Sequence, residues 1–197
     1  MIYKLNVGKI NTMQFGDTQY ISDDIFFAGC SRRCPTCFNK DLWNPSLGDE
    51  QTPIQIFNRL SKVKWVCLIG GEPLEQDTES LRSLVDLLHK SGKKITLFTS
   101  VLNPWHYISV DHYHIDIKPF HPDKIPVPPK GVGVSYGVIA QPDEVPCINK
   151  FKNIALYNIY IKSLNGIHTQ TTDLWVEVFR AYGLSPLVDS KIYVDNP

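Results

Sequence analysis

The sequence predicts an α/β fold in which parallel strands and helices alternate to form a partial (βα)6-like barrel, open on one side. Two observations indicate this fold. Short apolar segments suited to buried strands alternate along the chain with segments whose apolar residues recur every three or four positions, as in helices. The chain also has 197 residues, whereas a complete eight-unit barrel typically needs about 250. Five or six units therefore fit better than eight.

The first half of the chain is expected to contain four strands and three helices. The strands are expected at residues 21–28, 64–69, 94–99 and 113–117, and the helices at 52–60, 77–91 and 103–108. Thr52 can cap the first helix, with Pro53 at its first position. The apolar face is expected to carry Ile54, Phe57 and Leu60 in the first helix, and Leu81, Leu84, Val85 and Leu88 in the second. Gly92 is expected to end the second helix.

The second half of the chain is less regular. Residues 121–130 are rich in proline and are expected to form a loop, and residues 132–140 form either a strand or part of an insertion. A strand is expected at 153–162, a helix at 171–182 with Leu174, Val178 and Tyr182 on one face, and an edge strand at 191–194. We therefore expect one domain over 1–197, with an N-terminal extension at 1–20 and an irregular insertion at 121–150.

The composition is that of an ordinary globular protein. Hydrophobic residues make up 43% of the chain, charged residues 20%, and the formal net charge is zero. No overall field would attract nucleic acid or an anionic membrane. The N-terminus lacks the apolar run of a signal peptide, and no apolar stretch approaches the roughly 20 residues of a membrane span. We expect a cytoplasmic protein without membrane or nucleic-acid partners.

Three of the five cysteines crowd into eight residues, which read Cys30-Ser31-Arg32-Arg33-Cys34-Pro35-Thr36-Cys37. This C-x3-C-x2-C spacing allows three thiolates in one loop to bind one iron–sulfur cluster. Because no fourth cysteine is near, one iron would remain open for a substrate. A zinc site completed by a distant histidine is the alternative, although C-x2-C zinc sites usually come as two pairs. A disulfide framework does not fit an odd number of clustered cysteines.

Two further segments follow expected strands. Gly70-Gly71-Glu72-Pro73 ends the strand at 64–69, and its glycines would let the backbone approach a ligand closely. Alone, this segment is as consistent with an ordinary turn. In the strand at 113–117 side chains alternate, so that one face carries His112, His114, Asp116 and Lys118 and the other Tyr113, Ile115 and Ile117. The polar face is expected to point into a cavity, unless Asp116 and Lys118 form a purely structural ion pair.

The cysteine spacing followed by Gly-Gly-Glu-Pro resembles the radical S-adenosylmethionine (SAM) superfamily. The resemblance implies that Cys30, Cys34 and Cys37 are catalytic residues and metal ligands that hold a [4Fe–4S] cluster. It implies that reductive cleavage of SAM yields methionine and a 5′-deoxyadenosyl radical. The residues expected to bind SAM are Gly70, Gly71, Glu72, Pro73, Ser100, Asp116 and Lys118. Asp116 and Lys118 resemble the Asp-x-Lys strand motif of glycyl-radical activases, in which this pair helps to hold SAM.

Within the superfamily, Cys34-Pro35-Thr36-Cys37-Phe38-Asn39 resembles the activating proteins of anaerobic ribonucleotide reductase. That likeness implies a glycyl-radical enzyme, the reductase large subunit, as partner, and an electron donor such as a flavodoxin or ferredoxin. A small-molecule radical SAM enzyme of the 7-carboxy-7-deazaguanine synthase kind is an alternative, and a non-enzymatic Fe–S or zinc module is another. Cys67 is expected in the core and Cys147 in a loop.

Overall fold

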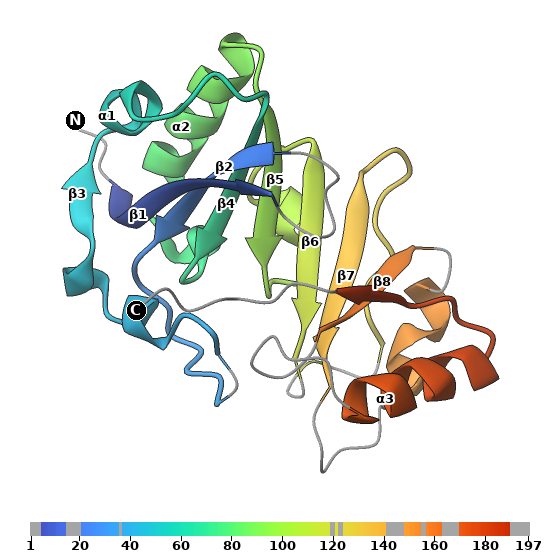
Figure 1. Ribbon diagram of the computed structural model, residues 1–197. Helices are drawn as coiled ribbons and strands as arrows, with labels where there is room; N and C mark the ends of the chain where they lie inside the picture. Colours follow the sequence, from blue (N-terminus) through green and yellow to red (C-terminus); the bar gives the residue numbers. More distant parts are fainter. Residues whose placement is uncertain are drawn as a thin grey trace.

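One mixed β-sheet organises the chain in the computed structural model, which describes residues 5–14, 21–35, 37–118, 121, 124–140, 148–154, 157–162 and 170–189. The nine strands of this described part follow the order β3-β1-β2-β4-β5-β6-β7-β8-β9 (Figure 1). The strands are β1 (Leu5–Gln14), β2 (Ile21–Phe27), β3 (Asp49–Gln51), β4 (Trp65–Gly70), β5 (Lys94–Thr99), β6 (His112–Ile117), β7 (Val134–Ile139), β8 (Asn158–Lys162) and β9 (Leu187–Asp189).

Within the described residues, three α-helices and five short 3-10 helices connect these strands. They are α1 (Pro53–Asn58), α2 (Thr78–Lys90) and α3 (Gln170–Ala181), with η1 (Lys40–Trp43), η2 (Pro45–Leu47), η3 (Pro73–Glu75), η4 (Pro104–His106) and η5 (Ile148–Ile154). In Figure 1, α1 and α2 lie together beside the first half of the sheet, and α3 lies beside β7 and β8. None of the helices in the described ranges is both long and apolar enough to cross a bilayer.

The expected open α/β architecture is confirmed. Neighbouring strands from β2 through β9 pair in parallel, while β1 pairs antiparallel with both β2 and β3. The sheet does not close, because β3 and β9 end the strand order. Parallel strands place their carboxyl ends at one edge, where connecting loops build a site.

Two segments that the sequence left outside the regular fold are strands. Residues 5–14, assigned to an N-terminal extension, form β1, in which Leu5 and Val7 are buried. Residues 132–140, expected as either a strand or part of an insertion, contain β7 at 134–139 between β6 and β8, and Val134, Tyr136 and Val138 are buried. β1 pairs with β2 and β3, and β7 pairs with β6 and β8, and a local pattern does not reveal this pairing. The strand expected at 191–194 lies outside the described residues.

The helices begin close to where expected, but the buried faces of two of them differ in part from the expected ones. In α1, Thr52 caps the helix in a capping box with Gln55, and Phe57 and Leu60 pack against the core as expected, whereas Ile56 is buried and Ile54 is 52% exposed. In α2, Asp77 is the N-cap, Gly92 follows the helix with a positive φ of 75°, and Leu81, Leu84, Val85 and Leu88 are buried as expected.

In α3 two of the three residues of the expected apolar stripe face solvent. Leu174 and Tyr182 are 57% and 63% exposed, Val178 is partly buried against the core, and Trp175 and Phe179 are buried. The neighbouring stripe, one residue along, carries the larger aromatic rings and therefore buries more apolar area.

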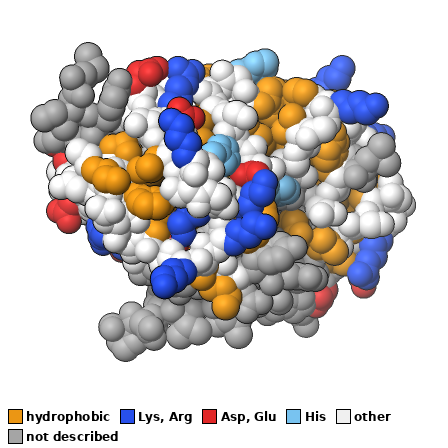
Figure 2. Space-filling view, turned by 90° about the horizontal axis from the view of Figure 1, so that it is seen from above, with side chains coloured by type: hydrophobic (Ala, Val, Ile, Leu, Met, Phe, Trp, Pro, Cys, Tyr) orange, Lys and Arg blue, Asp and Glu red, His pale blue; other side chains and the backbone are white. Residues whose placement is uncertain are grey.

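The two faces of the sheet differ in character. The apolar core lies on the helix-covered face and includes Leu68, Leu97 and Ile115, together with Leu84 of α2. The other face carries buried polar side chains, namely Ser22, Asp24, Thr96, His114 and Ser135. The face seen in Figure 2 carries basic and acidic side chains side by side rather than a patch of one sign.

Candidate active site

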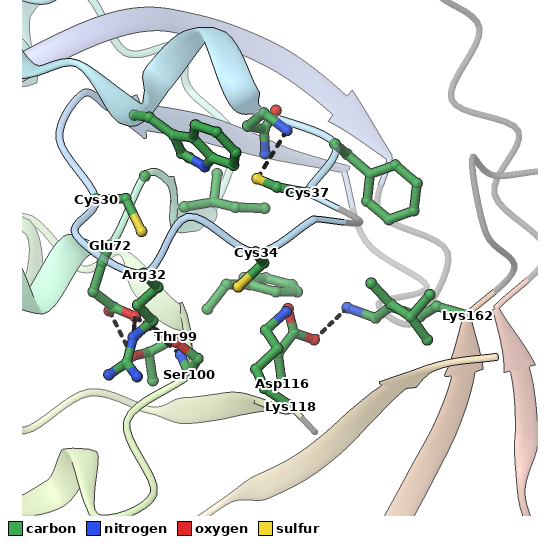
Figure 3. Close-up of a pocket in the computed structure, with 18 residues that line it drawn as sticks. Cys30, Arg32, Cys34, Cys37, Glu72, Thr99, Ser100, Asp116, Lys118 and Lys162 are labelled. Carbon is green, nitrogen blue, oxygen red and sulfur yellow. Dashed lines mark hydrogen bonds and ion pairs between the residues drawn. The ribbon is translucent and has the colours of Figure 1, made fainter. Parts of the chain in front are cut away.

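The cysteine loop follows β2 and opens onto a pocket at the carboxyl ends of the parallel strands. Cys30, Cys34 and Cys37 are partly exposed free thiols, and all three line this pocket (Figure 3). Arg33, held at a positive φ of 51°, donates to the Trp43 carbonyl at 3.1 Å and to the Cys30 carbonyl, and its guanidinium lies 5.3 Å from the Trp43 ring centroid. Arg33 therefore fixes the shape of the loop.

The glycine turn is bonded directly to the start of the cysteine loop. Gly71 N–H donates to the Phe27 carbonyl at 2.8 Å, and Glu72 N–H donates to the Gly29 carbonyl at 2.9 Å. A Cβ on Gly71 would lie only 2.2 Å from the Gly29 oxygen, so no side chain fits there. Gly70 has a φ of 107°, a conformation that favours glycine. The glycine pair is thus required by close packing against the cysteine loop.

Glu72 lies at the floor of the pocket, with 2% of its surface exposed. Its carboxylate accepts from Thr99 Oγ1 at 2.6 Å and from both the amide and the hydroxyl of Ser100 at 3.1 Å. Arg32 Nε is 3.7 Å away, so the cysteine loop contributes a cation to the same group (Figure 3). Glu72 was expected to bind SAM, but these protein groups already occupy much of the hydrogen-bonding capacity of its carboxylate.

Asp116 joins two lysines from different strands within the pocket. Lys118 Nζ lies 3.2 Å from Asp116 Oδ2, and Lys162 Nζ of β8 lies 2.9 Å from Asp116 Oδ1 (Figure 3). Burial alone would raise the pKa of the Asp116 carboxyl, but Lys118 and Lys162 hold it well below its ordinary value. The pocket therefore presents a carboxylate that stays ionised and fixes two ammonium groups.

Most of the expected site residues are brought together in this pocket. The lining includes Gly70, Gly71, Glu72, Ser100, Asp116 and Lys118 as well as the three cysteines. Pro73 instead begins η3, is buried, and does not line the pocket. Arg32 and Lys162 also line it. Lys162 was not among the expected site residues, because only strand register shows that it meets Asp116.

The donor set of the loop fits an iron–sulfur cluster, which takes cysteine thiolates as ligands. As placed, the side chains do not close around one point, since no three Cys, His, Asp or Glu side chains in the described ranges form a metal-binding group. Burial raises the pKa of the Cys30 thiol, and a backbone hydrogen bond from Arg32 opposes that rise. Cys67 is buried in β4, as expected, while Cys147 lies outside the described residues.

The chain is similar to an iron–sulfur domain family and to two activating proteins. Residues 22–111 match the family model described as "4Fe-4S single cluster domain". The pyruvate formate-lyase-activating enzyme of Clostridium pasteurianum is 32% identical over 94 residues, which cover 44% of this chain and 39% of the relative. The anaerobic ribonucleoside-triphosphate reductase-activating protein of Escherichia coli strain K12 is 33% identical over 85 residues, 38% of this chain and 55% of the relative.

A solved structure matches the fold across almost the whole chain. The crystal structure of QueE from Escherichia coli superposes with a TM-score of 0.68 and covers 95% of both chains, at 15% sequence identity. It confirms the open α/β architecture, including the strands beyond residue 111. The cluster-domain match and the activating-enzyme relatives support the resemblance to the radical SAM superfamily, whose cofactors are a [4Fe–4S] cluster and SAM.

Proposed function

We propose that this chain cleaves SAM reductively and uses the resulting radical to install a glycyl radical on an anaerobic ribonucleotide reductase. One observation carries the first half of the proposal. The cysteine loop and the glycine turn are hydrogen-bonded to each other, and the Asp116 and Lys118 side chains line the same pocket. Cluster ligands and polar groups for an amino acid are thereby within reach of one another.

Each group of residues has a proposed role. Cys30, Cys34 and Cys37 would hold the cluster. In its reduced state the cluster would supply one electron for breaking the carbon–sulfur bond of SAM. The Gly70–Gly71 backbone would lie along the methionine part of SAM, and Glu72 would hold Thr99 and Ser100 in place beside it. Lys118, fixed by Asp116, would receive the SAM carboxylate.

The second half of the proposal concerns the substrate. The 5′-deoxyadenosyl radical would take a hydrogen atom from a glycine Cα, giving 5′-deoxyadenosine and a glycyl radical on the partner. The names of the two relatives support this step, since both are activating proteins. The matched segments cover only 39% and 55% of those relatives, so the partner and the activity remain our proposal.

SAM cleavage is tested with anaerobically reconstituted protein, reduced with dithionite in the presence of SAM. Methionine and 5′-deoxyadenosine should form in equal amounts. Cys34→Ala should abolish both the cluster absorbance and the products, whereas Cys67→Ala, a matched change at a buried thiol in β4, should retain both. Stoichiometric zinc without iron, or cleavage that survives Cys34→Ala, would refute the proposal.

Radical transfer is tested by electron paramagnetic resonance on a co-expressed anaerobic ribonucleotide reductase. A glycyl radical should appear only with SAM and reductant. Docking is tested with Lys40→Glu, because Lys40 is exposed at the start of η1. Arg33 is less suitable for a charge reversal, because its side chain also supports the cysteine loop. Lys40→Glu should weaken association and leave SAM cleavage unchanged. SAM cleavage without a radical on any cognate reductase would exclude this substrate.

A small-molecule radical SAM enzyme, of the 7-carboxy-7-deazaguanine synthase kind, is the second candidate. The pocket favours it in one respect, since Arg32, Lys118 and Lys162 contribute three cationic side chains to the lining, which suits a charged small ligand. Turnover of a deazapurine precursor, without a glycyl radical on a reductase, would select this candidate.

A further inference from the structure

A row of buried and partly buried polar side chains runs along the inner face of the sheet toward the pocket. His112 Nε2 lies 2.9 Å from Ser135 Oγ, and the same oxygen lies 2.9 Å from His114 Nδ1. His114 Nε2 then lies 3.6 Å from Asp116 Oδ1. The three contacts link β6 to β7 in a single line, from the first residue of β6 to the carboxylate between the two lysines.

When both imidazole rings are neutral, the Asp116 carboxylate sets the donor and the acceptor of each hydrogen bond along this row. A carboxylate can only accept, so the His114 nitrogen that faces Asp116 carries the hydrogen and Nδ1 accepts. Ser135 must then donate its hydroxyl hydrogen to His114 Nδ1, which leaves its oxygen to accept from His112 Nε2–H. The distance of 3.6 Å exceeds a normal hydrogen bond, but a carboxylate at that range still favours the ring tautomer that turns N–H toward it.

The His114 ring has little freedom to turn away. It is 1% exposed, with the Phe98 ring of β5 4.7 Å away and the Tyr160 ring of β8 5.9 Å away, measured between centroids. Such burial between two aromatic rings fixes the imidazole plane. The direction of its N–H is therefore set by Ser135 and Asp116.

Gly137 makes the meeting of these groups possible. In the parallel register it lies beside Asp116 on one side and Tyr160 on the other. A Cβ at this position would lie 2.6 Å from Asp116 Oδ1, 2.6 Å from His114 Nε2 and 2.8 Å from Lys162 Cε. Because Gly137 has no side chain, Asp116 of β6 and Lys162 of β8 can contact each other across β7.

We propose that His112, Ser135 and His114 are positioning residues: a one-way relay of two hydrogen bonds turns the His114 N–H toward Asp116, which lies between Lys118 and Lys162 in the gap left by Gly137. A carboxylate held this way keeps both ammonium groups aimed into the pocket. The inference rests on the proposed function in one respect, namely that Lys118 receives the carboxylate of SAM.

The relay is tested first without SAM, by nitrogen-15 NMR of the imidazole rings in the full chain at about pH 8, where ordinary histidines are neutral. Both His112 and His114 should carry the proton on Nε2. Ser135→Ala should produce mixed tautomers at His112, whereas His114, still beside Asp116, should keep its proton on Nε2. The control is Thr96→Val, which removes an equally buried hydroxyl beside His112 in the register of β5 and should change neither ring. A proton on Nδ1 of His114 in the unmodified chain would overturn the proposal.

The second measurement is SAM affinity of the cluster-loaded protein by calorimetry. Ser135→Ala and Gly137→Ala should each weaken binding roughly threefold to tenfold, the scale of one hydrogen bond. His114→Gln, which can keep an N–H toward Asp116, should bind SAM more tightly than His114→Leu. Equal affinity of these two variants, or an unchanged affinity in Ser135→Ala, would refute the relay. If the unmodified protein bound no SAM, the proposed function would fail, while the NMR result would still decide the relay.

Discussion

Glu72 shows how one side chain connects several parts of the site. Its carboxylate caps η3 through Leu74 N–H at 3.3 Å, and it also accepts from Thr99 and Ser100 at the end of β5. Identity and spacing were enough to single out this residue in the sequence. Its partners could not be found that way, because they lie on a strand 27 and 28 residues away and meet it only through the register of β4 and β5.

Glu72→Ala should weaken SAM binding by roughly 1–3 kcal/mol, the scale of a lost charge-assisted hydrogen bond. It should also lower the unfolding temperature, because the Thr99 hydroxyl and the Ser100 amide would lose a buried acceptor. Glu72→Gln retains an acceptor oxygen and should recover more of the stability than of the affinity. Calorimetry and thermal unfolding measure the two effects. SAM affinity in Glu72→Ala equal to that of the unmodified protein would remove Glu72 from the site.

Asp111 gives a prediction about pH. It accepts from Lys94 Nζ at 2.5 Å and Ile95 N–H at 2.9 Å, with His89 Nε2 at 3.0 Å. Burial acts to raise its pKa, but these hydrogen bonds lower it below its ordinary value. A lowered folded-state pKa stabilises the fold above the unfolded value of about 3.9, and this contribution is lost as the pH falls through the folded-state pKa.

Asp111→Asn should therefore be less stable by about 1 kcal/mol at pH 7, as expected for a partly exposed hydrogen-bonded charge. The difference should shrink progressively below pH about 4, where the unmodified carboxyl also loses its charge. Urea unfolding at several pH values measures it. A deficit that stayed constant down to pH about 2 would show that the charge of Asp111 contributes nothing.

At the scale of elements, helix ends were easier to predict than helix faces. Thr52 and Asp77 cap α1 and α2 through side-chain bonds that depend on a few neighbouring residues. The buried face of α1 depends instead on how a six-residue helix sits on the sheet, and this directs Ile56 inward rather than Ile54. A repeat of three or four residues cannot be located reliably in so short a segment.

Ile56→Ala and Ile54→Ala form a matched pair for this helix. Ile56 is fully buried, so its truncation should cost about 2–5 kcal/mol of unfolding free energy. Ile54 is 52% exposed, and its truncation should stay within about 0.5 kcal/mol. Urea unfolding distinguishes them, and equal losses would contradict the packing of α1.

The glycine turn allows a second paired test. Gly71→Ala would drive a methyl group into the Gly29 carbonyl, so it should separate the turn from the cysteine loop and reduce cluster content after reconstitution. Gly92→Ala is the control, because it also introduces a methyl, at a φ of 75° but with no atom within 4 Å. It should cost about 1 kcal/mol of stability and retain the cluster. Normal iron content in Gly71→Ala would mean that the two loops are not coupled.

For the whole molecule, local patterns predicted the first parallel strands and the loops after them. They did not place β1, since Leu5 and Val7 are ordinary alternating residues until a partner strand covers them. They left β7 open between a strand and an insertion, because residues 132–140 follow a proline-rich loop. The site was predictable to the extent that it depends on unusual residues at fixed spacing, such as the cysteines. Lys162 belongs to it only because β8 pairs beside β7.

Cluster loading should stabilise the whole chain. The cysteine loop is bonded to the glycine turn, and Ser31 donates from its amide and its hydroxyl to Glu75 at 2.7 Å. Metal–thiolate bonds formed only in the folded state add to its stability. Thermal unfolding should occur at a higher temperature after anaerobic reconstitution, and the rise should be absent in Cys37→Ala. No change in the unmodified protein would show that cluster and fold are uncoupled.

The order of strands has a consequence for how the chain is made. From β5 onward, each strand of the described sheet pairs with the strand that precedes it in sequence, while β4 joins β2 and β3 extends the opposite edge through β1. A polypeptide emerging from the ribosome amino-terminus first can therefore grow this sheet at one free edge, without opening strands already paired. The cysteine loop and Asp116 are in place before translation reaches Lys162, so the pocket is completed by the penultimate strand of the sheet.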